Sequence, residues 1–262
     1  MNILLTNDDG IDFIFFTRFA EALRELSGHT LFVIAPDGER SGFSHHITFL
    51  SGPVRLKKQA ENVWACSGTP ADCVMMGAMD ALGCSIDFVV SGINNGANLG
   101  TDIIYSGTAA AARQAVLHGI PSAAFSLVRD GEKTAFWDAA IAYSVQHLEE
   151  FVGLWNPDVF LNVNLPNTPQ GPDGYELTFP VRRYYPDKIK LFDAPDRKRY
   201  CFMDAGTSSA ESEPGSDYDA VSRNKASISA VFIHPVVQRG LCPDAPGHAA
   251  VESRPEQRMN RK

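Results

Sequence analysis

Two adjacent carboxylates follow the first apolar run of the chain. Residues 2–6 (NILLT) predict a strand, and Asn7-Asp8-Asp9-Gly10 predicts a sharp loop after it. Two like charges this close together are costly unless a cation lies between them or one carboxyl group is protonated. Carboxylate, amide and hydroxyl oxygens are hard ligands that suit Mg²⁺ or Mn²⁺. Asp8 and Asp9 therefore favour a divalent-metal site over the alternative in which Asp8 caps a turn and Asp9 faces solvent.

A glycine-rich segment at 92–100 follows residues 87–91, which predict a buried strand. It carries Asn94 and Asn98 among glycines, and glycine allows a backbone to approach a ligand closely. The spacing matches neither the G-x-G-x-x-G dinucleotide fingerprint nor the Walker phosphate loop. On its own, the segment indicates either a ligand-binding loop or an ordinary turn-rich connection.

Hydroxyl groups lie in two further loops. Ser106-Gly107-Thr108 precedes an alanine-rich helix, where free N–H groups and the positive helix end favour a bound phosphate. Simple helix capping is the alternative for these residues. The loop after the predicted strand at 30–35 contains Ser41 and His45. His45 could contact a substrate or act as an acid, and a solvated loop histidine is the alternative.

Strands and helices alternate through the first 170 residues. The hydrophobic patterns predict strands at 2–6, 30–35, 62–66, 87–91, 121–127 and 158–163, with helices at about 13–26, 70–82, 108–118 and 134–153. This alternation predicts an α/β fold with a doubly wound, mostly parallel sheet. Ligands bind outside the carboxyl ends of the strands in such a sheet. All four polar loops could therefore converge on one edge.

The composition changes after about residue 170, where Pro, Gly and Asp become frequent. We predict a core at 1–170, a smaller β-rich C-terminal lobe at 171–239 and a polar tail at 240–262.

Composition excludes several classes of protein. The 262 residues include 23 Lys+Arg and 31 Asp+Glu, a formal net charge of −8, and 44% are hydrophobic. No run approaches the ~18 apolar residues of a membrane helix, and the start resembles a strand rather than an export signal. We therefore expect a cytoplasmic protein without a membrane partner. The acidic balance argues against a nucleic-acid polymer as partner, and the five cysteines lack the C-x-x-C pair of a zinc site.

Seven motifs, in order, link the chain to a known family. They are TNDDG at 6–10, APDGERSG at 35–42, SGTPADCV at 67–74, SGINNGANLGTDIIYSGT at 91–108, GIPSAAFS at 119–126, LNVNLP at 161–166 and PGSDYDAVS at 214–222. Together they resemble the SurE survival-protein family over nearly the whole chain. The resemblance implies a metal-dependent acid phosphatase that hydrolyses nucleoside 5′- and 3′-monophosphates and, in some members, short polyphosphate.

The resemblance also implies a role for each matching residue. One divalent ion per subunit, Mg²⁺ or Mn²⁺, would be held by Asp8, Asp9, Ser41 and Asn94. The positions that match the phosphate pocket are Asn98, Ser106, Gly107 and Thr108. The family's Rossmann-like domain and its C-terminal lobe, which exchanges a hairpin and tail between subunits, imply a homodimer or homotetramer.

Three positions depart from the family pattern. Asp12-Phe13-Ile14-Phe15 stands where the family usually has His-Ala-Pro-Gly, Gln114-Ala115 where it has Glu-Gly, and His46 where it has Ser. None of these changes removes a proposed metal ligand. They bear on substrate range and subunit packing.

The leading expectation is hydrolysis of a phosphomonoester by a metal-bound water or by direct attack of Asp8. An aspartate-nucleophile phosphatase of the haloacid dehalogenase type is a weaker alternative, because that family requires Asp-x-Asp where this chain has Asp8-Asp9-Gly10. An alternative of another class is a catalytically weakened nucleotide-binding or sensing module with the same pocket.

Overall fold

The computed structural model describes residues 1–129, 134–206, 208–210 and 212–235. The predicted tail at 240–262 lies outside the described residues. Within them, no helix has the length and apolar character needed to cross a membrane.

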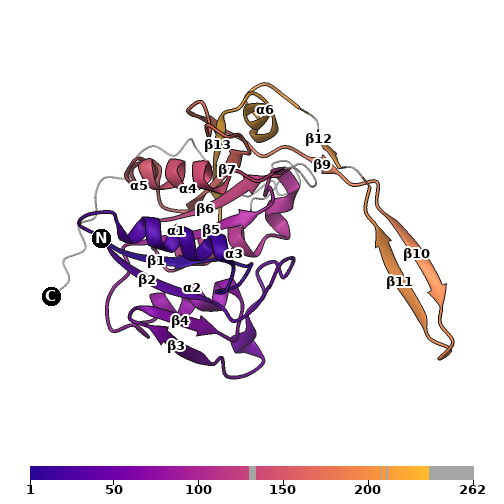
Figure 1. Cartoon of the computed structure of the whole chain (residues 1–262), viewed down its shortest axis with the longest axis horizontal. Coiled ribbons are helices and arrows are strands. Elements are labelled where there is room, and N and C mark those ends of the chain that lie inside the picture. Colours follow the sequence, from indigo (N-terminus) through magenta and orange to yellow (C-terminus); the bar gives the residue numbers. More distant parts are fainter. Residues whose placement is uncertain (130–133, 207, 211, 236–262) are drawn as a thin grey trace, which may run out of the picture.

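A nine-stranded sheet forms the centre of the molecule (Figure 1). Its order is β3 (Leu56–Ala60), β4 (Val63–Cys66), β2 (Thr30–Pro36), β1 (Asn2–Thr6), β5 (Phe88–Asn95), β6 (Ser122–Val128), β7 (Val159–Pro166), β13 (Ala226–Phe232) and β8 (Tyr175–Thr178). Only the β3–β4 and β7–β13 pairs are antiparallel. The predicted mostly parallel α/β sheet is therefore confirmed. Its last two strands come from beyond residue 170, so the sheet crosses the predicted boundary.

Helices cover both faces of the sheet because its strands are apolar on both sides. In β1, Ile3 and Leu5 face one core and Leu4 faces the other. The first face carries α1 (Ile14–Arg24), α4 (Trp137–Gln146) and α5 (Leu148–Leu154). The second carries α2 (Pro70–Ala78) and α3 (Gly107–Leu117). The helix expected over 134–153 is thus two helices, which meet at His147.

Aromatic packing accounts for the first departure from the family pattern. Phe15 stacks on Trp137 of α4 with ring centroids 4.5 Å apart, and Phe13 meets the same indole edge-on at 5.6 Å. Bulky side chains at the start of α1 therefore fill the contact with α4. Their role in the fold is to join two helices on one face of the sheet.

A long hairpin projects from the body (Figure 1). It consists of β10 (Lys188–Asp193) and β11 (Arg199–Asp204), and every residue of both strands is exposed. The short pair β9 (Arg183–Tyr184) and β12 (Ser209–Ala210) lies at its base. The helix α6 (Asp217–Ser222) and the 3-10 turns η1 (Thr48–Leu50) and η2 (Gly100–Ile104) complete the described elements.

Candidate active site

Asp8 lies at the carboxyl end of β1, directly against the N-terminus of α3. Its side chain is buried, with 3% of the residue exposed. The Thr108 hydroxyl donates to Asp8 Oδ1 at 2.5 Å, and the backbone N–H groups of Gly107 and Thr108 act on this carboxylate to lower its pKa. The helix start predicted to bind phosphate therefore faces a carboxylate of the chain itself. Ser106 caps the helix, because its Oγ accepts from Ala109 N–H at 3.0 Å.

Burial dominates the protonation of both carboxyl groups. It raises the pKa of Asp8, and the hydrogen bonds from Thr108 and Gly107 oppose that rise. For Asp9, burial and the neighbouring Asp8 charge raise the pKa to about 7, while the N–H of Asn95 opposes the rise. Without a cation, the pair is therefore held partly protonated near neutral pH.

The place of Asp8 requires a glycine at position 107. A Cβ atom there would lie 3.0 Å from both Cβ and Oδ2 of Asp8. That separation is below ordinary van der Waals contact, so a side chain at 107 would push the carboxylate by a few tenths of an ångström.

The loop after β2 is bound to the same strand end. Arg40 N–H donates to the Asp8 carbonyl at 2.7 Å, which brings the next residue, Ser41, to the edge of the site. The two loops approach each other so closely at Gly10 and Gly38 that a side chain on Gly10 would not fit. A Cβ on Gly10 would lie 2.9 Å from the Gly38 carbonyl carbon. Ser41 itself is exposed and open to a ligand.

The end of β5 approaches from the other side. Asn95 N–H reaches the Asp9 carboxylate, so the adjacent Asn94 lies beside the pair. Asn94 Nδ2 donates to the Gly96 carbonyl at 2.9 Å. Its Oδ1 is then the atom suited to bind a cation.

Several buried oxygens at these strand ends lack partners among the described residues. They are Thr6 Oγ1, Asn7 Oδ1, Asp9 Oδ2 and Ser91 Oγ. A buried carboxylate oxygen without a donor is costly, and a bound cation would relieve that cost. The described residues hold no group of three His, Cys, Asp or Glu suited to a metal. A metal here would therefore use the two carboxylates with neutral oxygens such as Ser41 and Asn94, a donor set that fits Mg²⁺ or Mn²⁺.

Comparison with known proteins decides the family. The family model for survival protein SurE matches residues 3–187. This chain belongs to the SurE family. Relatives named 5′-nucleotidase SurE include that of Geotalea daltonii, 41% identical over 235 residues (89% of this chain, 93% of the relative). That of Caldanaerobacter subterraneus subsp. tengcongensis is 38% identical over 237 residues (88% and 91%). The crystal structure of the SurE protein from Aquifex aeolicus superposes with a TM-score of 0.76 at 31% identity, covering 90% of this chain and 95% of that one.

Two residues predicted for the SurE site, Asn98 and His45, bond to groups other than the two carboxylates. Asn98 Nδ2 donates to Ser126 Oγ at 2.7 Å, and the Asn98 backbone bonds to side chains of β7. His45 Nε2 lies 2.8 Å from Gln114 Oε1, two turns along α3 from Gly107. Gln114, one of the departures, in turn contacts His118. No described contact joins Asn98 or His45 to the two carboxylates.

The structure adds residues to which the sequence patterns assigned no role. Asn162 and Asn164 of β7 bind the Asn98 backbone, and Asp217 accepts from Gly100 N–H at 2.6 Å. The available signal was the alternation of polar residues in LNVNLP, an otherwise apolar strand. Two buried polar side chains on one face of a strand must find partners, and these meet the 92–100 loop.

Proposed function

We propose that this chain is a metal-dependent phosphomonoesterase that hydrolyses nucleoside 5′-monophosphates to nucleoside and phosphate. The proposal includes nucleoside 3′-monophosphates and short polyphosphate as further substrates. The observation that carries the proposal is the pair formed by buried Asp8 and half-buried Asp9, with Asp9 Oδ2 lacking a donor and Asp8 held by the start of α3. The relatives are named 5′-nucleotidase SurE, and these names support the same reaction.

One divalent ion per subunit, Mg²⁺ or Mn²⁺, would be held by Asp8, Asp9, Ser41 and Asn94. When bound, it would supply a Lewis acid that polarises a phosphoryl oxygen and offsets the negative charge on the transferring group.

The neighbours of Asp8 fix its carboxylate in one orientation. The Thr108 hydroxyl donates to Asp8 Oδ1, and the backbone N–H groups of Gly107 and Thr108 lower the pKa of Asp8. Each of these interactions stabilises the negative charge and lowers the nucleophilicity of the carboxylate. This arrangement supports Asp8 as a ligand that orients an attacking water, over Asp8 as the nucleophile. Acid quenching during turnover should therefore trap no phosphoenzyme, and an aspartyl-phosphate at Asp8 would reverse this assignment.

The departures from the family pattern give little support to a weakened binding module. Phe13 and Phe15 pack against α4, and Gln114 contacts two histidines away from the carboxylates. None of them occupies the described contacts of Asp8 or Asp9.

A panel of substrates tests the proposed reaction. Purified protein is incubated with 5′- and 3′-nucleoside monophosphates, p-nitrophenyl phosphate and tripolyphosphate, with EDTA, Mg²⁺ or Mn²⁺. We expect phosphate release that EDTA abolishes and a divalent ion restores. Binding of a nucleoside monophosphate by folded protein without release under either metal would instead establish the binding module.

Metal affinity should depend on pH through Asp9. Its pKa is raised from 3.8 to about 7, so Asp9 carries a proton below pH 7 that a metal must displace. We expect the affinity for Mn²⁺ to fall by up to about tenfold per unit as pH drops from 7 to 5.5. Calorimetric titration measures this directly. The Asp9→Asn variant, which cannot titrate there, should show weaker binding with a flatter dependence; an equally flat profile in the wild type would contradict the prediction.

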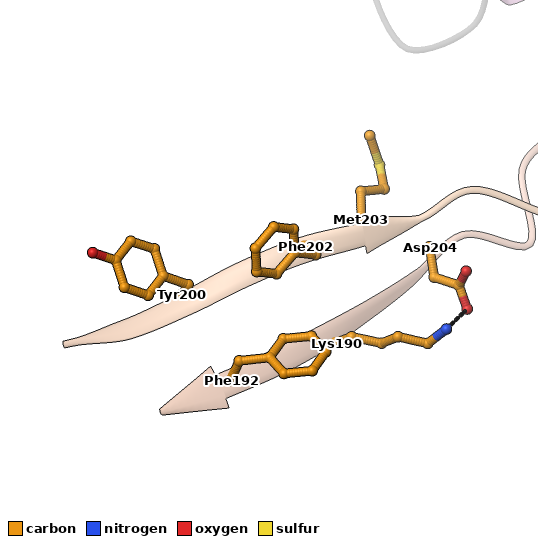
Figure 2. A pocket seen from close by; sticks show the side chains of 6 residues that line it. All are labelled: Lys190, Phe192, Tyr200, Phe202, Met203 and Asp204. Carbon is orange, nitrogen blue, oxygen red and sulfur yellow. Dashed lines mark ion pairs between the residues drawn. The ribbon is translucent and has the colours of Figure 1, made fainter. Parts of the chain in front are cut away.

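We further propose that the chain forms a homodimer or homotetramer through the β10–β11 hairpin. Phe202 exposes 56% and Met203 69% of their surface. Figure 2 shows apolar side chains along the hairpin beside the Lys190–Asp204 ion pair of 2.7 Å. They border an open pocket of about 560 Å³. A lone two-stranded hairpin is at best marginally stable in water, and large exposed apolar patches mark interaction sites.

Charging the hairpin should dissociate the assembly. A carboxylate at position 202 would have to be buried in the interface, which is unfavourable without a cationic partner. We expect Phe202→Asp to shift the mass measured by light scattering to that of a monomer. Leu50→Asp, at a more exposed apolar residue on η1, should leave the mass unchanged. An unchanged mass for Phe202→Asp would place the interface elsewhere.

Cytoplasmic location and the absence of a nucleic-acid partner stay predictions of the sequence.

A further inference from the structure

Two exposed aromatic residues lie on segments that flank the carboxylate pair. Phe43 exposes 49% of its surface and comes two residues after Ser41, a proposed metal ligand. Tyr105 exposes 62% and comes two residues before Gly107, where a Cβ would lie 3.0 Å from Asp8 Oδ2. Two residues of chain span at most about 7 Å, so both aromatic residues lie at the rim of the candidate site. Their exposure leaves them open to a ligand.

Ser44 joins the two segments through its side chain and its backbone. Ser44 Oγ donates to the Ile104 carbonyl at 2.6 Å, and Ser44 N–H donates to the Tyr105 carbonyl at 3.1 Å. Its φ of 54° lies in the left-handed region, which a residue other than glycine adopts when its surroundings hold it there. Phe43, Ile104 and Tyr105 therefore lie on adjoining backbones. All three are exposed, and we call them the apolar rim.

Both the backbone and the ring of Phe43 are held in place. Phe43 N–H donates to the Arg40 carbonyl at 3.3 Å, and Arg40 N–H donates to the Asp8 carbonyl at 2.7 Å. His46, one of the departures from the family pattern, meets the Phe43 ring edge-on with the ring centroids 6.4 Å apart. An aromatic side chain that is already held loses little conformational entropy when another ring stacks on it. Phe43 is therefore prepared for stacking before a ligand arrives.

We propose that the apolar rim binds the nucleobase of a nucleoside monophosphate, with Phe43 and Tyr105 as its stacking partners, while the phosphate group meets the carboxylate site. The inference rests on the proposed phosphomonoesterase function and names the part of the substrate that this surface binds. The three rim residues carry no charge, so the surface suits an uncharged aromatic ring better than a second phosphate group. Every base has a π-face, so stacking here accepts several bases.

A second copy of the chain is the alternative occupant of an exposed apolar surface. The place of the rim favours the base. Each of its two aromatic residues is two positions from a residue of the candidate site, so a ligand whose phosphate lies at that site brings its base to the rim.

Phe43→Ala separates the base from the phosphate group in the binding of substrate. KM for adenosine 5′-monophosphate should rise about tenfold, the usual effect of losing one stacking partner. The value of kcat should not change, because binding lost equally from the ground and transition states raises KM alone. Ribose 5-phosphate carries the same phosphate ester without the base, so its KM should stay as in the wild type. Phe43→Trp, which keeps an aromatic ring, should keep both KM values.

Adenosine alone gives a measurement that needs no turnover. Calorimetric titration of the metal-loaded protein with adenosine should show about tenfold weaker binding in Phe43→Ala than in the wild type. Phe49→Ala is the matched control, because Phe49 is an exposed aromatic residue of the same loop whose N–H bonds to Asp72 of α2. It should change neither adenosine binding nor either KM.

Several results would overturn the inference. They are an unchanged KM for adenosine 5′-monophosphate in Phe43→Ala, an equal rise in KM for ribose 5-phosphate, and no binding of adenosine by the wild type. A lower mass of Phe43→Ala by light scattering would show that a second copy of the chain covers the rim. If the wild type releases no phosphate, the proposed function fails, and adenosine binding by the wild type against Phe43→Ala still decides whether the rim holds a base.

Discussion

Asp8→Asn should lower phosphate release from nucleoside monophosphates by about a thousandfold. The change removes a full charge from the metal site, and an interaction of ~4 kcal/mol in the transition state corresponds to that factor. The hydrogen bond to the neighbouring hydroxyl can be kept. Thr108 Oγ1 donates to Asp8 Oδ1 at 2.5 Å. A hydroxyl can both donate and accept, so it can bond to either the oxygen or the nitrogen of an asparagine amide.

Steady-state kcat with saturating Mn²⁺ measures the effect of Asp8→Asn, and Asp138→Asn provides the control. Asp138 lies on α4, where it is exposed and forms an ion pair with Arg18 of α1. Its change to an amide should therefore leave turnover unchanged. The folded state should not suffer in Asp8→Asn, because burial raises the Asp8 pKa and its charged form opposes folding at neutral pH. The melting temperature without metal should therefore be equal or higher. Full activity in Asp8→Asn would refute the metal assignment.

Gly107→Ala should lower kcat/KM by about tenfold through displacement of Asp8. The added Cβ would lie 3.0 Å from Asp8 Cβ and Oδ2, and the carboxylate is the group that can move. A shift of about 1 Å in a reacting geometry costs on the order of a hundredfold, and a shift of a few tenths of an ångström costs correspondingly less. We also expect weaker Mn²⁺ binding, because the displaced carboxylate is a proposed ligand.

Gly153→Ala is the matched control for Gly107→Ala. Gly153 lies within α5, and a Cβ there meets nothing within 4 Å. Alanine should stabilise this helix by up to about 1 kcal/mol with activity unchanged. Activity of Gly107→Ala equal to that of Gly153→Ala would show that the start of α3 tolerates a side chain beside Asp8.

Much of the fold was predictable because its signals are local. Every strand of the predicted core is present, from β1 at Asn2–Thr6 to β7 at Val159–Pro166. Short apolar runs bounded by Gly, Pro and Asp are typical of buried strands, and their alternation with helices restricts the sheet to a parallel arrangement. The carboxyl-edge rule then predicted that Asp8 and Asp9 lie at the end of β1, where the structure has them.

Irregular and edge elements were harder to predict from the sequence. The strand β3 at Leu56–Ala60 is largely exposed and was not predicted, because it lacks the apolar run that marks a buried strand. The pairing of β13 with β7 joins residues about 65 positions apart, Ser227 with Asn164 among them. No local pattern specifies such a partner, since strand pairing is decided by packing across the whole sheet.

The sequence by itself determined the family, the alternating α/β elements and the residue types of the candidate site. The tertiary structure alone decided what each donor faces. The Thr108 hydroxyl at the start of α3 meets Asp8, a hundred residues earlier in the chain, and the Asn98 backbone meets Asn164 of β7. A helix N-terminus attracts any nearby anion, and a buried asparagine accepts any complementary partner. The residue types state what can bind, and only the packing of distant segments selects which group does.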